Sequence, residues 1–140
     1  MNQTLPSPLP PAVAAAVQQR FDTCPISTQV FNLAGWTVYV NPAWEAFFQA
    51  PREVAGLFNI LQDRQLIENG LLPRIQAAFA GATVRLQAVP FEARKSAVRG
   101  QQARQRIDAF FFPIRGEDGA LAGVAVQHID VTAEHADRAG

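Results

Sequence analysis

Apolar residues recur along this chain in two periods, one typical of helices and one typical of strands. Val13, Val17 and Phe21 follow one another at intervals of four, which places them on one stripe of a helix predicted over residues 12–22. The same helical spacing returns at residues 71–80, where Gly81 stands at the position expected for a helix end. Shorter helical segments are predicted at residues 42–48, 51–56 and 63–68.

The strand-like segments lie on either side of these short helices. Residues 26–32 and 36–40 are separated by a glycine-containing turn and predict a hairpin. Later the period falls to about two, and strands are predicted at residues 83–92, 106–115 and 120–129. Three consecutive phenylalanines, Phe110 to Phe112, indicate that both faces of the middle strand of these three are covered. The element order is typical of an α+β domain.

Charge and rare residues narrow the function classes. Twelve basic and twelve acidic side chains give a formal net charge of zero, which argues against a nucleic-acid partner. Cys24 is the only cysteine, which excludes an internal disulfide and a multi-thiolate metal site, and two histidines are few for a histidine-rich site. No signal peptide and no run of about 18 apolar residues is present. We therefore expect a cytoplasmic location, no metal site and no membrane contact.

Three local motifs, taken in order, resemble the PAS sensor family. Asn41-Pro42-Ala43-Trp44 follows the first predicted hairpin, as at the family's strand-to-helix junction, and Asn41 can cap the helix that follows. The segment 51–56 (Pro-Arg-Glu-Val-Ala-Gly) is similar to the family's next helical turn, although Ala50 stands where a capping serine is commoner. The last hairpin closes at Asp130-Val131-Thr132, which looks like the family's junction with an output helix. The resemblance covers roughly residues 24–132.

The resemblance implies a five-stranded antiparallel sheet of strand order 2-1-5-4-3, with short helices on one face enclosing a cavity. It also implies a flanking helix on the other face, which often supports dimerisation. The expected organisation is a proline-rich lead at 1–11, a flanking helix at 12–23, a PAS-like domain at 24–132 and the start of a truncated linker helix at 133–140. The parent would be a bacterial signalling protein such as a histidine kinase.

A pocket between these helices and the sheet is the main candidate site. Its expected lining is Trp44, Phe48, Phe58, Leu61, Leu72, Ile75, Phe79, Phe110, Phe112, Val126 and His128. The alternative is that these side chains simply fill a small core. The predicted helix at 71–80 has no histidine to serve as the family's proximal haem ligand, and Cys24 precedes the first strand, away from the family's photoreactive thiol. We therefore expect neither haem nor a photoreactive flavin, and a small metabolite is the remaining candidate ligand.

Three functions remain open at this point. In the first, a ligand or partner shifts the sheet, and Asp130 and Thr132 relay the shift to a covalently linked effector. In the second, the chain is a ligand-free homodimerisation module with Val13, Val17 and Phe21 at its interface. The third is a small enzyme of the ketosteroid-isomerase-like class, for which Asp108 is the one strand-centred acid, but no catalytic motif is present.

Overall fold

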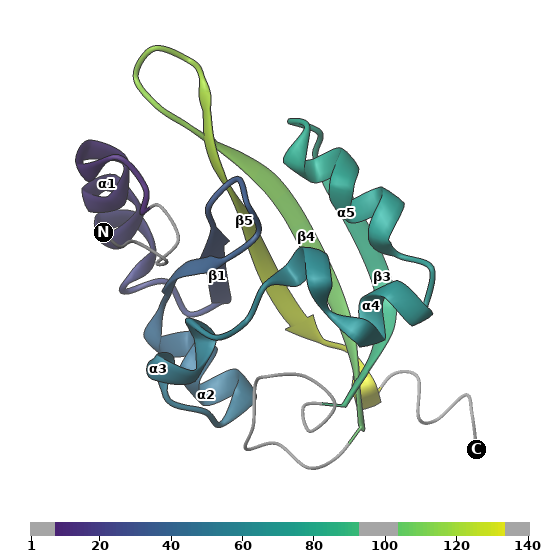
Figure 1. Ribbon diagram of the computed structural model, residues 1–140. Coiled ribbons are helices and arrows are strands. Elements are labelled where there is room, and N and C mark those ends of the chain that lie inside the picture. Colours follow the sequence, from purple (N-terminus) through teal and green to yellow (C-terminus); the bar gives the residue numbers. More distant parts are fainter. Residues whose placement is uncertain (1–7, 93–103, 134–140) are drawn as a thin grey trace.

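A five-stranded antiparallel sheet organises the computed structural model, which describes residues 8–92 and 104–133 (Figure 1). The strands run in the order β2-β1-β5-β4-β3. Their bounds are β1 Ser27–Phe31, β2 Thr37–Val40, β3 Val84–Glu92, β4 Arg104–Arg115 and β5 Leu121–Asp130. The α+β class and the strand order expected from the sequence are therefore confirmed.

Helices lie on both faces of the sheet (Figure 1). The N-terminal helix α1 (Pro11–Phe21) packs on one face, which we call the outer face. The other, inner face carries α2 (Pro42–Phe48), α3 (Arg52–Ala55), the 3₁₀ turn η1 (Ile60–Gln62), α4 (Arg64–Glu68) and α5 (Leu72–Phe79).

The predicted helices and strands are present, with ends that differ by one or two residues. Strand β4 begins at Arg104, two residues before the predicted start, so the segment between the predicted strands at 83–92 and 106–115 is shorter than expected. Residues 93–103, between β3 and β4, and the linker helix expected beyond residue 133 lie outside the described residues.

Each face of the sheet has its own hydrophobic core. On the inner face, Phe31, Trp44 and Ile75 are fully buried, and the Phe31 ring lies 6.1 Å from that of Phe79 between centroids. On the outer face, α1 packs over Val30 and Ala125. Strand β1 and residues 123–126 of β5 are thus buried, because both faces of these two strands are covered.

The described residues contain no helix with the length and apolar character that a bilayer crossing requires. In the same part of the chain, no group of three or more histidine, cysteine or acidic side chains is placed to hold a metal ion.

Candidate functional site

A small cavity lies between the inner face of the sheet and the helices α2, η1 and α4. Its volume is about 70 Å³. The strands contribute Gln29, Phe31, Leu86, Val89, Ile107, Ala109, Phe111, Val126 and His128 to its wall, and the helical side contributes Trp44, Phe48, Phe58, Ile60 and Leu66. The wall is therefore almost wholly apolar. Its hydrogen-bonding side chains are those of Gln29, His128 and Trp44.

Five of the side chains predicted for the pocket do line it. They are Trp44, Phe48, Phe58, Val126 and His128. Four others lie elsewhere on the inner side. Ile75 is in the inner core, Leu61 and Phe79 are partly buried against it, and Leu72 is partly exposed at the start of α5. Helix α5 thus covers the sheet beside the cavity, not at it.

The orientation predicted for Phe110 and Phe112 is wrong. Phe111 lines the cavity, whereas Phe112 packs on the outer face, 6.4 Å from the Phe21 ring. Phe110 shares the outer side by strand alternation, with the Arg85 guanidinium 5.1 Å above its ring. The sequence could not decide between the two orientations, because three consecutive phenylalanines satisfy either one. Pairing of Phe111 with Val126 decides it.

The cavity residues that sequence reasoning missed lie mainly on β3 and β4. Ile107, Ala109 and Phe111 alternate along β4, and the last two pair with His128 and Val126 of β5. The register of β4 against β5 is the signal that identifies them, because two of them pair with His128 and Val126, which the sequence predicts for the pocket. Leu86 and Val89 break the alternation of β3, and no pattern in the sequence indicates that.

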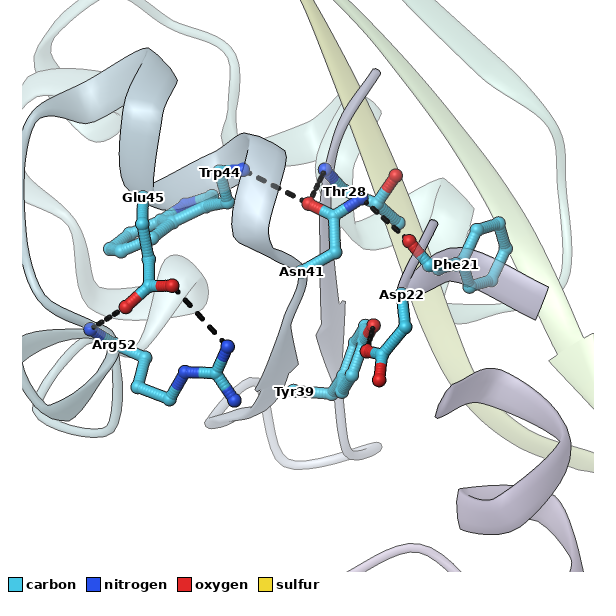
Figure 2. Close-up of polar contacts among 8 residues, drawn as sticks. All are labelled: Phe21, Asp22, Thr28, Tyr39, Asn41, Trp44, Glu45 and Arg52. Atoms are coloured by element: carbon cyan, nitrogen blue, oxygen red, sulfur yellow. Dashed lines mark hydrogen bonds and ion pairs between the residues drawn. The ribbon is translucent and has the colours of Figure 1, made fainter. Parts of the chain in front are cut away.

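The Asn41 side chain joins three elements beside the cavity and is fully buried (Figure 2). Its Oδ1 accepts the backbone N–H of Thr28 at 2.9 Å and that of Trp44 at 3.0 Å. Its Nδ2 donates to the carbonyl oxygens of Phe21 and Ile26, both at 3.0 Å. One amide therefore caps α2, as its sequence position predicts, and also fixes β1 and the end of α1.

A second polar chain runs through the cavity wall. Trp44 Nε1 donates to Gln29 Oε1 at 3.1 Å, and Gln29 Nε2 donates to Thr37 Oγ1 at 2.9 Å. The Thr37 hydroxyl in turn donates to the Phe58 carbonyl oxygen at 3.2 Å. These bonds satisfy polar groups that would otherwise be costly to bury, and they fix the Trp44 ring at the cavity.

His128 lines the cavity from β5, two residues before that strand ends at Asp130. Its Nδ1 shares a hydrogen bond of 3.0 Å with Ser27 Oγ. The Phe48 ring meets the imidazole edge-on at 5.0 Å between centroids, and Phe47 lies at 5.8 Å. Nε2 has no hydrogen-bond partner among the described residues. Burial lowers the pKa of His128 to about 3, so the ring is neutral at physiological pH.

The apolar stripe of α1 is covered within its own chain. Val13, Val17 and Phe21 are all buried against the outer face of the sheet. The end of α1 is also fastened to β2, because Tyr39 donates a hydrogen bond to the Asp22 carboxylate. Burial, together with that carboxylate, raises the pKa of Tyr39 above its usual range. The three stripe residues are thus not free to form a dimer interface in this conformation, and the homodimer itself stays a prediction.

Glu45 ties α2 to the start of α3 (Figure 2). Its Oε2 accepts the Arg52 backbone N–H at 3.0 Å, and its Oε1 lies 3.3 Å from Arg52 Nη2. The Arg52 guanidinium lowers the pKa of the Glu45 carboxyl. The pair is exposed, so it contributes little to stability.

The predicted relay residues hold the end of β5 against the start of β4. Asp130 Oδ1 accepts the Thr132 N–H at 2.9 Å, and Thr132 Oγ1 accepts the Arg106 N–H at 2.9 Å. The Val131 N–H donates to the Arg106 carbonyl oxygen at 2.8 Å. We call residues 130–132 the junction. Its two hydrogen bonds with Arg106 make the path of the chain after β5 dependent on β4.

Two further candidates lie away from the cavity. Cys24 packs with the outer core, so its thiol is on the opposite side of the sheet from any molecule in the cavity. The position of Cys24 and the small volume of the cavity therefore do not fit a flavin that forms a thiol adduct. The Asp108 carboxylate accepts the Ala88 N–H and pairs with Arg85, and it does not line the cavity. The enzyme hypothesis therefore loses its proposed base.

Comparison with known proteins identifies the architecture. No protein-family model and no curated protein sequence matches the chain. Among solved structures, the Rhodobacter sphaeroides LOV protein matches 88% of this chain and 69% of its own, with 12% identity and a TM-score of 0.69. The PAS domain of the fruit-fly ELK potassium channel matches 85% of this chain and 97% of its own, with 14% identity and a TM-score of 0.62.

A third similar structure comes from a signalling protein. It is a domain of the sensory box sensor histidine kinase/response regulator from Geobacter sulfurreducens, which matches 81% of this chain and 91% of its own. The identity is 16% and the TM-score is 0.52. At these identities the three likenesses establish the fold.

Replacing Asn41 tests its role in joining three elements. Asn41→Ala leaves two N–H groups and two carbonyl groups without their buried partner, so we expect the free energy of unfolding to fall by about 3–5 kcal/mol. Urea unfolding followed by circular dichroism measures the change. Asn69→Ala, at an exposed position after α4, is the matched control and should change stability by less than about 0.5 kcal/mol. Equal effects of the two substitutions would contradict the role given to Asn41.

The burial of His128 predicts a pH dependence of stability. The folded-state pKa of about 3 lies below the unfolded value of about 6.5, so the unfolded chain binds the extra proton as the pH falls. Stability from this group is complete above pH 7 and should fall by about 2 kcal/mol between pH 7 and pH 5. Urea titrations of the wild type and His128→Gln at both pH values isolate it, because His135 is present in both proteins. Parallel pH profiles would contradict a His128 ring that stays neutral in the folded protein.

Proposed function

We propose that this chain, which has the PAS fold, is the sensory module of a signal-transduction protein. A small uncharged molecule enters the cavity and changes the position of β4 and β5. The change passes through the junction at residues 130–132 to a covalently linked effector.

One observation carries this proposal: the cavity wall and the junction share the same two strands. Ala109 and His128 line the cavity and pair with each other across β4 and β5. Two residues further along, Ile107 of the cavity wall pairs with Asp130 of the junction. A molecule that separates the wall therefore acts on residues adjacent to the junction contacts. Packed strands transmit such displacements because the interior has little free volume.

The wall determines the chemistry of the ligand. A cavity of about 70 Å³ is far smaller than the roughly 300–1,000 Å³ of pockets for drug-sized ligands, so a molecule of about four heavy atoms fits it. The neutral imidazole offers no charge to an anion, and among the described residues no acid lines the cavity to bind a cation. His128 Nε2 offers one hydrogen bond, as donor or acceptor according to the tautomer. A short alcohol fits all three conditions, because a hydroxyl group serves either tautomer.

The size of such a ligand limits its affinity. The best small ligands gain about 1.5 kcal/mol per heavy atom, which for four atoms corresponds to a Kd of about 40 µM at best. A sensor of this type responds to an abundant metabolite, not to a trace signal.

The effector and the assembly complete the proposal. We assign the effector to the histidine kinase class, which is supported by the similar domain from the Geobacter sensor kinase. We place the protein in the cytoplasm, in keeping with its single cysteine. The homodimer would use surfaces other than the stripe on α1, since that stripe is covered.

The proposal predicts that 1-propanol binds in the cavity of the 140-residue chain. Calorimetric titration should give a Kd in the millimolar range or tighter. Ala109→Leu fills the cavity and should abolish binding, whereas His128→Phe keeps a ring but removes the hydrogen bond and should weaken binding about fivefold. Propionate, of the same length but charged, should not bind.

Absence of binding by any short neutral molecule would contradict the sensory proposal. The small volume of the cavity favours one runner-up, a ligand-free dimerisation module. That reading gains support if light scattering then shows a dimer whose affinity is unchanged by Ala109→Leu.

A further inference from the structure

The pairing of β3 with β4 is interrupted at one point. Leu86 pairs with Ala109, and the next inward pair is Val89 with Ile107. Strand β3 thus advances three residues while β4 advances two, and both Gln87 and Ala88 lie opposite Asp108. This is a β-bulge, which adds one residue to one strand and changes the direction of the side chains that follow.

The bulge determines which side chain of β3 reaches the cavity. Leu86 and Val89 are both buried and both line it. In a regular strand, side chains two residues apart share a face, so Ala88 would point inward and Val89 outward. The extra residue therefore places a valine, and not an alanine, in the cavity wall.

One residue of this bulge has an unfavourable backbone conformation. Ala88 has a φ of 51°, in the left-handed region that residues with a Cβ rarely adopt. Glycine is the usual residue at such a position in a bulge. A non-glycine residue stays there only when its surroundings hold it.

The side chain of Asp108 supplies that restraint. Its Oδ1 accepts the Ala88 N–H at 2.7 Å, and the bulge leaves this N–H outside the regular strand pairing. Its Oδ2 lies 3.3 Å from Arg85 Nη2, and the carboxylate is only 14% exposed. Asp108 itself points away from the cavity, between Ile107 and Ala109, which both line it.

We propose that Asp108 is a positioning residue that sets the size of ligand the cavity accepts, by holding the bulge that places Val89 in the wall. The inference rests on the proposed function, since it concerns the specificity of the same cavity. Without the hydrogen bond to Ala88, the strain at Ala88 is relieved by a one-residue shift of β3. Ala88 then replaces Val89 in the wall, and the cavity gains the volume that separates valine from alanine.

The test compares 1-propanol and 1-pentanol as probes. The wild type should prefer 1-propanol, and Asp108→Ala should raise the ratio of 1-pentanol to 1-propanol affinity about tenfold, since two more methylene groups become buried. Asp108→Asn keeps an oxygen that accepts the Ala88 N–H and should behave as the wild type. Arg85→Gln removes the ion pair with Asp108 and the guanidinium above the Phe110 ring but leaves the Asp108 hydrogen bond to Ala88. It is the matched control and should also retain the wild-type preference.

A double variant separates positioning from general damage. Ala88→Gly removes the backbone strain, so Ala88→Gly combined with Asp108→Ala should recover the preference for 1-propanol. An unchanged preference in Asp108→Ala, or a change of equal size in Asp108→Asn, would overturn the proposal.

Nuclear Overhauser contacts of the Val89 methyl groups give a readout that does not need ligand binding. In the wild type these groups should contact the aromatic rings of the cavity, and in Asp108→Ala the contacts should be lost. If no alcohol binds the wild type, the proposed function fails, while loss of the contacts still supports the positioning role. Contacts that persist in Asp108→Ala refute that role whatever binds.

Discussion

The buried amide of Asn41 is the interaction on which the rest of the structure depends. Four backbone groups, from the end of α1, the start of β1 and the first turn of α2, bond to this one side chain. Its Oδ1 accepts two N–H groups, and its Nδ2 donates to two carbonyl oxygens. No apolar residue satisfies those groups, and no smaller polar residue reaches all of them. Because α2 carries Trp44 and Phe48, the position of this amide also sets one wall of the cavity.

Strands β4 and β5 contribute to the opposite wall, and the proposed function couples this part of the wall to the junction. The strands that line the cavity continue, within two residues, into the contacts among Arg106, Asp130 and Thr132. A site of this kind needs no catalytic group and no charged ligand. It needs a wall that moves when a ligand occupies the cavity, and it needs the end of β5 to be held by that wall. Both depend on the hydrogen-bonded pairing of β4 with β5.

The sequence predicted the elements, the strand order through its resemblance, and the cap at Asn41, because each depends on local spacing or on short motifs. It predicted the cavity only in part. Phe111 could not be told from its two neighbours, since their parity is decided by pairing with Val126. Val89 could not be found because the bulge at Ala88 depends on the side chain of Asp108, which is distant in sequence. The apolar stripe on α1 predicts an interface as readily as a contact within the chain, because a helix pattern does not reveal which surface covers it.

Amide chemical shifts of the ¹⁵N-labelled chain test most directly whether the cavity is coupled to the junction. With saturating 1-propanol, we expect the amide signals of Arg106, Val131 and Thr132 to shift together with those of the cavity wall, because these three N–H groups form the junction contacts. The same addition to Ala109→Leu should leave them unmoved. Shifts confined to the cavity wall in the wild type would contradict the account, since the ligand would then bind without acting on the end of β5.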